Sequence, residues 1–117
     1  RYTINIPKDA WMVNMDENLD THCMLCGEDY GSGCFRGEAK IDGTDWKDEL
    51  HDVVPESVKQ RWNQVISFVI TSTDEEFKQN LGNYFDVESL IDYHLFGLYS
   101  CGLDAYGKNQ IYLTYDG

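Results

Sequence analysis

Asp104 and Asn109 stand five residues apart in a short polar stretch, and their side chains are suited to phosphoryl transfer. In enzymes that move a phosphoryl group from ATP to a hydroxyl, an Asp accepts the hydroxyl proton. An Asn five residues later holds a metal ion on the phosphates. The same residues are also common in turns, and Gly102 and Gly107 precede them here. A pair of turn-forming residues is therefore the alternative interpretation.

A helix before this loop and a strand after it are expected to position the two side chains. Residues 87–101 have a helical apolar period after a capping Asp86, and Ile111, Leu113 and Tyr115 alternate with polar neighbours as in a strand. The predicted inner face of the helix consists of Val87, Leu90, Ile91, His94 and Leu98. Within that stripe, a hydrogen-bonded core histidine is favoured over a catalytic base for His94.

Two further helices are expected earlier in the chain. Residues 55–72 follow a 3.6-residue apolar period after Pro55, and residues 74–82 follow a capping box made by Thr73 and Glu76, with Phe77 and Leu81 facing inward. A single helical turn is predicted at residues 46–50. The three helices are expected to pack through Trp62, Ile66, Leu90, Ile91 and Leu98.

The first part of the chain is turn-rich, with short strands expected near residues 2–6 and 34–41. The predicted fold class is α+β, mainly helical, with short strands at both ends. We expect an irregular, β-containing segment at residues 1–45 and a helical lobe at residues 46–117, together forming one structural unit.

Length and charge limit what the chain can be and what it can bind. A chain of 117 residues is long enough to form one domain with a hydrophobic core. The net charge of −12 repels the phosphates of nucleic acids and the headgroups of anionic membranes, so we expect neither as a partner. No apolar run is long enough to cross a bilayer. The chain begins with Arg and ends on the turn-like TYDG, so we expect a piece of a longer protein.

Two metal-site patterns are incomplete. Cys23 and Cys26 have the spacing of half a zinc site, which Cys34 and a histidine could extend, but a second close pair is missing and reduced thiols are the favoured interpretation. The run Asp16-x-Asn18-x-Asp20 starts like a calcium loop, yet the required Gly and Glu are absent. A solvated acidic loop fits this stretch better.

The stretches GTDWKDELHD and FDVESLIDYHLFGLYSCGLDAYGKNQIYLTYDG resemble the CotH kinase-like family, which is known from spore-coat proteins and from proteins of bacteria and their tailed phages. The resemblance covers roughly residues 38–117, about two thirds of the chain. It implies an atypical protein kinase that uses ATP with Mg²⁺ or Mn²⁺. By the same resemblance, Asp104 is the proton acceptor, Asn109 a metal ligand, and Lys108 a residue that neutralises phosphate.

The chain departs from the kinase pattern in several places. Tyr106 stands where kinases often carry a loop lysine, and Gly102 and Leu103 replace the usual His-Arg pair. A second metal-binding Asp and a lobe that covers ATP are expected elsewhere in the parent protein. We therefore expect this fragment of the helical lobe to be inactive alone.

Three hypotheses follow. The parent is an atypical kinase acting on a protein substrate, or it is a non-catalytic structural or host-interaction protein in a spore coat or phage particle. The least favoured is a small metal-binding module around Cys23, Cys26 and Cys34. Fold resemblance alone does not separate the first two.

Overall fold

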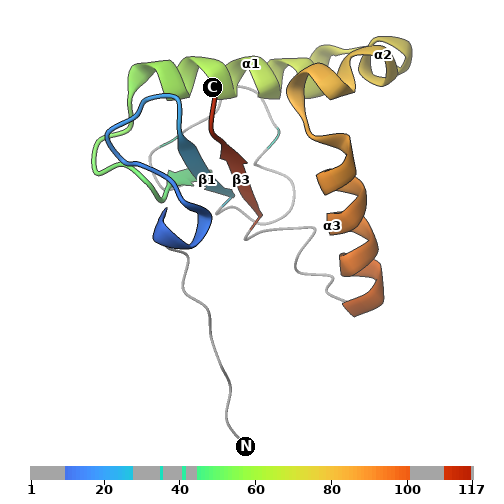
Figure 1. The fold of residues 1–117 in the computed structure, drawn as a ribbon. Coiled ribbons are helices and arrows are strands. Elements are labelled where there is room, and N and C mark those ends of the chain that lie inside the picture. Colours follow the sequence, from blue (N-terminus) through green and yellow to red (C-terminus); the bar gives the residue numbers. More distant parts are fainter. Residues whose placement is uncertain (1–9, 28–34, 36–40, 42–44, 101–109, 117) are drawn as a thin grey trace, which may run out of the picture.

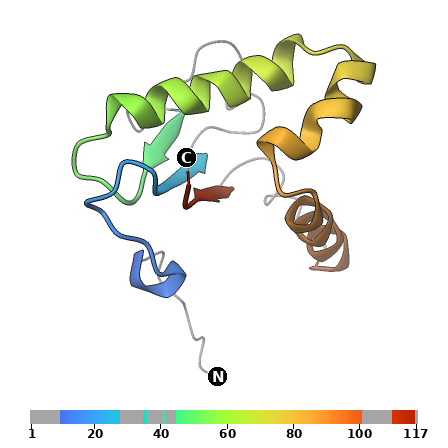
Figure 2. The same ribbon diagram turned by 45° about the horizontal axis from the view of Figure 1, so that its top comes forward.

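The computed structural model describes residues 10–27, 35, 41, 45–100 and 110–116. Helices and a small sheet make up this part of the chain, so the predicted α+β class is confirmed (Figure 1). Helix α1 runs along one side of the sheet, α2 continues from its far end, and α3 stands beside the sheet in both views (Figures 1 and 2). In chain order the elements are η1 (Ala10–Val13), β1 (Cys23–Gly27), β2 (Trp46–Asp48), α1 (Glu56–Thr71), α2 (Asp74–Tyr84), α3 (Val87–Ser100) and β3 (Ile111–Thr114).

The sheet brings together segments from both ends of the chain. Its strand order is β2-β1-β3, and β1 pairs antiparallel with both neighbours. Leu25 lies opposite Asp48 on one side and opposite Tyr112 on the other. All five residues of β1 are buried, since this central strand is covered on both faces.

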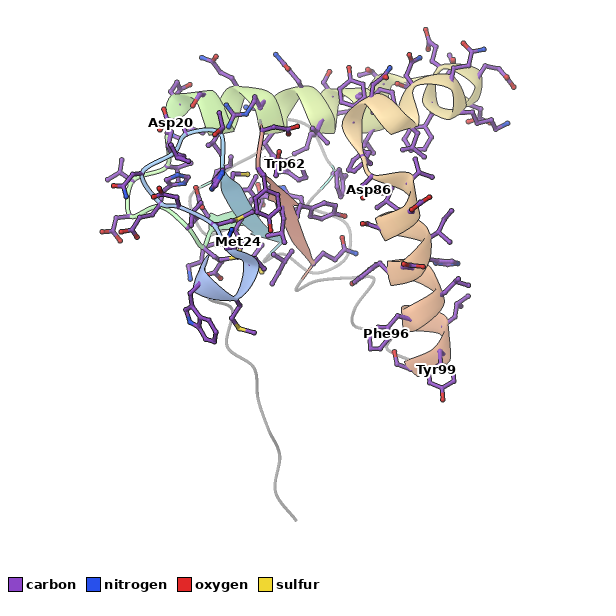
Figure 3. All side chains as sticks on the ribbon, viewed as in Figure 1. Asp20, Met24, Trp62, Asp86, Phe96 and Tyr99 are labelled. Carbon is purple, nitrogen blue, oxygen red and sulfur yellow. The ribbon has the colours of Figure 1, made fainter. Side chains whose placement is uncertain are left out.

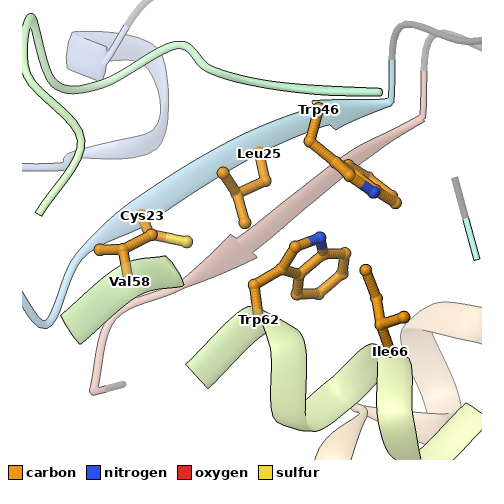
Figure 4. Close-up of a cluster of buried hydrophobic side chains, with 6 residues drawn as sticks. All are labelled: Cys23, Leu25, Trp46, Val58, Trp62 and Ile66. Atoms are coloured by element: carbon orange, nitrogen blue, oxygen red, sulfur yellow. The ribbon is translucent and has the colours of Figure 1, made fainter. Parts of the chain in front are cut away.

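The main core lies between the sheet and α1. The rings of Trp46 and Trp62 meet edge to face with their centroids 4.8 Å apart. The cluster, drawn in Figure 4, consists of Cys23, Leu25, Trp46, Val58, Trp62 and Ile66. A second, smaller cluster holds Met15, Met24 and Leu50. Because Met24 lies between Cys23 and Leu25 in β1, its side chain points to the opposite face of the sheet.

The first two helices follow the sequence prediction closely. In α1, Trp62 and Ile66 are buried as expected, and Pro55 is the cap residue just before the helix. The predicted capping box of α2 is present: Glu76 N–H donates to Thr73 Oγ1 at 3.3 Å, and Thr73 N–H donates to Glu76 Oε2 at 2.9 Å. Phe77 packs on Phe68 of α1, with parallel rings whose centroids lie 5.2 Å apart.

Helix α3 forms where predicted, but its expected packing is wrong. Ile91 is 53% exposed and Leu98 is 58% exposed, while Leu90 is partly buried. Val87 and His94 are also exposed, so the core interpretation of His94 is wrong. Phe96 and Tyr99 lie near the end of α3 that is opposite Asp86 (Figure 3). The spacing of apolar residues correctly predicts that α3 has an apolar face. It does not predict whether another element of the chain covers that face.

The observed strands β1 and β2 also differ from the sequence prediction. Residues 46–48 form β2, not a helical turn, and the Cys23–Gly27 stretch is a strand, not part of an irregular loop. Strand β1 lacks polar alternation because both of its faces are buried, so its pattern gave no strand signal. The strand expected at residues 2–6 lies outside the described residues. Of residues 34–41, Phe35 and Ile41 are described, and Ile41 forms an isolated bridge with Trp46.

Candidate functional site

The three residues predicted to do chemistry, Asp104, Lys108 and Asn109, lie outside the described residues. The structure does describe both ends of the stretch that carries them. Helix α3 leads in and ends at Ser100, and Gln110 leads out into β3. The framework of the candidate loop is therefore visible, and the mutual placement of its three residues stays a prediction.

Gln110, the residue that follows the candidate loop, is attached to the sheet by its backbone and to Tyr112 by its side chain. The carbonyl oxygen of Gln110 accepts a hydrogen bond from Gly27 N–H at 2.8 Å. Its side-chain oxygen Oε1 accepts another from the Tyr112 hydroxyl, also at 2.8 Å. The ring of Tyr112 packs against Trp46 and Trp62, with centroid distances of 5.6 Å and 5.2 Å. The residue next to Asn109 is thus tied to both the sheet and the core.

The incoming helix begins with a strong cap. Asp86 Oδ1 accepts from the N–H groups of Glu88 and Ser89 at 3.0 Å and 3.2 Å, and the Ser89 hydroxyl donates to Oδ2 at 3.0 Å. These hydrogen bonds, with those from Ser89 foremost, hold the pKa of the Asp86 carboxyl below its usual value. The predicted cap of α3 is therefore present.

The cysteine pair is built into the sheet. Cys23 and Cys26 are not joined in a disulfide, and both are buried in β1. Residues three apart on a strand point to opposite faces, so the two sulfurs do not converge on one ion. Burial, helped by the charge of nearby Asp48, raises the pKa of the Cys23 thiol to about 11. Cys34 lies outside the described residues.

The acidic stretch that begins at Asp16 forms a local turn held by hydrogen bonds between Asp16 and Asn18. Asp16 Oδ1 accepts from both the backbone N–H and the side-chain amide of Asn18, each at 2.9 Å. The backbone hydrogen bond from Asn18 is the main reason that the pKa of Asp16 lies below its ordinary value. In the described part of the chain, no group of three or more His, Cys, Asp or Glu residues is placed to hold a metal ion.

Comparison with known protein families identifies the fold family. The family model of the CotH kinase protein matches residues 9–117, nearly the whole chain and all of the candidate loop. The chain belongs to the CotH kinase family. No curated protein and no solved structure matches it. The match extends well beyond the stretch over which the sequence alone showed a resemblance.

Membership in the CotH family suggests ATP and a divalent metal ion, and the donor atoms of the loop suit such an ion. Asn109, the residue that the resemblance assigns to the metal ion, offers an amide oxygen, and oxygen atoms are the ligands that Mg²⁺ and Mn²⁺ prefer. The thiols of Cys23 and Cys26 would suit a softer metal, but they are divided between two faces of β1.

One buried polar pair of this CotH chain, Asp48 and His51, was not predicted from the sequence. Asp48 Oδ2 lies 2.7 Å from His51 Nδ1, and the two side chains are 0% and 6% exposed. Asp48 Oδ1 also accepts from the backbone N–H groups of Leu50 and His51, at 2.9 Å and 3.3 Å. The pair closes the turn after β2. The Asp-x-x-His spacing suits one helical turn equally well, so it gave no warning of this arrangement.

In the described part of the chain, no helix is both long enough and apolar enough to span a membrane.

Proposed function

We propose that the protein carrying this chain transfers the γ-phosphoryl group of ATP to a hydroxyl of a protein substrate. The observation that carries this proposal is the CotH kinase family match over residues 9–117, which includes Asp104, Lys108 and Asn109. The described framework supports it, because a capped helix leads into the loop and a pinned strand leads out.

In the proposed reaction, the carboxylate of Asp104 accepts the proton of the attacking hydroxyl. The hydroxyl oxygen bonds to the γ-phosphorus, the bond from that phosphorus to the β–γ bridging oxygen breaks, and ADP leaves. Asn109 would hold Mg²⁺ or Mn²⁺, and the ammonium of Lys108 would offset phosphate charge. A bound divalent ion supplies charge neutralisation, which matters for a chain with a net charge of −12.

The test is Asp104→Asn in the full-length protein, assayed with radiolabelled ATP, Mn²⁺ and a generic protein acceptor. Transfer is expected to be abolished while the fold is retained, because the change removes the proton acceptor and keeps the side-chain size. Asn109→Ala should lower the transfer rate and should also make that rate depend less strongly on the Mn²⁺ concentration.

Asp92→Asn is the matched control, since Asp92 lies exposed on α3 outside the loop. It should transfer phosphate like the wild type. A fully active Asp104→Asn protein would remove the proposed role of Asp104 in catalysis.

A non-catalytic role is the second candidate. It would make the protein a structural or host-interaction component of a coat or phage particle, built on a kinase-like scaffold. The exposed apolar face of α3 favours it, because Tyr99 is 91% exposed and Leu95 and Phe96 lie exposed nearby. The missing His-Arg pair before Asp104 points the same way. A wild-type protein whose melting temperature does not change with MnATP would support this role over catalysis.

A further inference from the structure

A pocket of about 490 Å³ lies where the end of α1 meets α2, the junction visible in Figure 2. The residues that line it come from these two helices and the turn between them: Phe68, Ser72, Glu76, Asn80, Asn83 and Tyr84. We propose that this pocket binds the guanidinium group of an arginine side chain on a partner protein. The inference is independent of the proposed phosphoryl transfer, because it uses described residues of α1, α2 and their connection alone.

Aromatic rings from both helices form the apolar part of the pocket. The rings of Phe68 in α1 and Tyr84 in α2 are parallel, with centroids 4.0 Å apart, and Phe77 packs parallel to Phe68 as well. Phe68 is 9% exposed, so the core holds it in place, whereas Tyr84 is 42% exposed. A planar guanidinium can stack on an exposed tyrosine ring, because the face of the ring carries partial negative charge.

The polar part of the pocket offers hydrogen-bond acceptors. The backbone N–H and the hydroxyl of Thr73 both donate to Glu76 Oε2, at 2.9 Å and 2.8 Å, and Asn83 Nδ2 donates to Asn80 Oδ1 at 3.3 Å. Among the described residues, Glu76 Oε1, Asn83 Oδ1 and the Tyr84 hydroxyl therefore have no hydrogen-bond partner. A guanidinium has five N–H donors and no acceptor, so it complements such a site.

The electrostatics of the pocket also favour a cation. Helix α1 ends here with Phe68 and Ser72, and α2 ends here with Tyr84; the last turn of a helix carries partial negative charge, and neither last turn includes a basic residue. The partial positive charge at the start of α2 is offset by three acidic residues in its first turn. Hydrogen bonds from Thr73, the backbone one foremost, hold the pKa of the Glu76 carboxyl below its usual value, so this group is charged at neutral pH.

The same charges indicate an arginine that belongs to a polypeptide. Glu76, Asn83 and Tyr84 are exposed, so the pocket is open at the surface and a side chain can enter it from outside. Free arginine carries a carboxylate, which a chain with a net charge of −12 repels. An arginine within a polypeptide presents its guanidinium without that carboxylate.

The experiment is a calorimetric titration of the full-length protein with an acetylated and amidated Gly-Arg-Gly peptide at about 20 mM NaCl. The same peptide with citrulline, which keeps the shape and removes the charge, should bind about tenfold more weakly. Glu76→Gln should weaken binding of the arginine peptide about two- to fivefold, and glutamine preserves the capping box. Tyr84→Leu should weaken it by a similar factor, because leucine keeps an apolar group against Phe68 and removes the stacking ring.

Glu75→Gln is the matched control. Glu75 lies exposed in the same helical turn, with Oε1 3.8 Å from Lys78 Nζ, and it is not among the residues that line the pocket. The change removes the same charge and should alter the affinity by less than about 1.5-fold. Equal weakening by Glu75→Gln and Glu76→Gln would show a general attraction to an acidic protein and overturn the proposed site.

Two further results would also overturn the proposal, and both are measured on the wild type. The first is an arginine peptide that does not bind, or that binds no more tightly than the citrulline peptide. The second is free L-arginine that binds more tightly than the capped peptide, which would mark a small-molecule site in place of a contact with a partner protein. Neither result depends on whether the protein transfers phosphate.

Discussion

At the scale of single residues, the sequence pointed to chemistry more readily than to buried polar structure. Asp104 and Asn109 stand out because their spacing matches a reaction that needs a proton acceptor and a metal ligand. The Asp48–His51 pair was missed, because its role depends on burial and on backbone donors that only the fold brings into place. Residue spacing can therefore identify candidates for a known reaction. It does not predict which polar side chains become buried when the chain folds.

Cys23 provides a test at this scale. Its thiol has a pKa raised to about 11 from 9.0, chiefly by burial, so the folded state keeps the proton that the unfolded state loses above pH 9. The stabilising contribution is therefore complete below pH 9 and is lost as the pH rises from 9 to 11. Unfolding free energies of the wild type should fall over this range by about 2 kcal/mol more than those of Cys23→Ala.

Thiol labelling gives an independent check on Cys23. In a variant that carries Cys34→Ser and Cys101→Ser, the two remaining thiols are both buried in β1. At pH 8 they should react slowly with Ellman's reagent in the native protein and rapidly in the protein unfolded by urea. Rapid reaction of the native protein would contradict the burial of Cys23.

At the scale of elements, local signals were reliable for boundaries and poor for packing partners. The capping box of Thr73 and Glu76 and the cap at Asp86 both form as read from the sequence, since these contacts lie within one helical turn. Strand β1 was missed because its residues do not alternate. The apolar stripes of α1 and α3 look alike in sequence, but α1 lies on the sheet and α3 stands beside it.

The two isoleucines Ile66 and Ile91 test this difference with the same chemical change. Ile66, in α1, is 1% exposed, whereas Ile91, in α3, is 53% exposed. In this chain, Ile66→Ala should lower the unfolding free energy by about 3 kcal/mol, because it leaves a cavity in the core. Ile91→Ala should lower it by less than about 1 kcal/mol.

Urea denaturation of both variants measures the two values directly. Equal losses would mean that the α3 face is buried as deeply as α1, and the reported exposure of that face would be wrong.

At the scale of the whole molecule, charge is the dominant property. A net charge of −12 on 117 residues makes the compact state repel itself, and salt screens such repulsion. The melting temperature should therefore rise as NaCl is increased from about 20 mM to about 500 mM, at a pH near 7. Replacing Glu17 and Asp20, both exposed, with Gln and Asn should reduce that rise. A melting temperature that falls with added NaCl would show that attractive ion pairs outweigh the repulsion.

The central position of β1 has a consequence for how the protein folds. Cys23 pairs with Thr114, so the sheet closes a chain segment that includes every helix from α1 to α3. Contacts between residues so distant in sequence form slowly, because the entropy of closing the intervening chain must be overcome first. We therefore expect the hydrogen bond that anchors Gln110 to form late in folding, together with the β1–β3 contact.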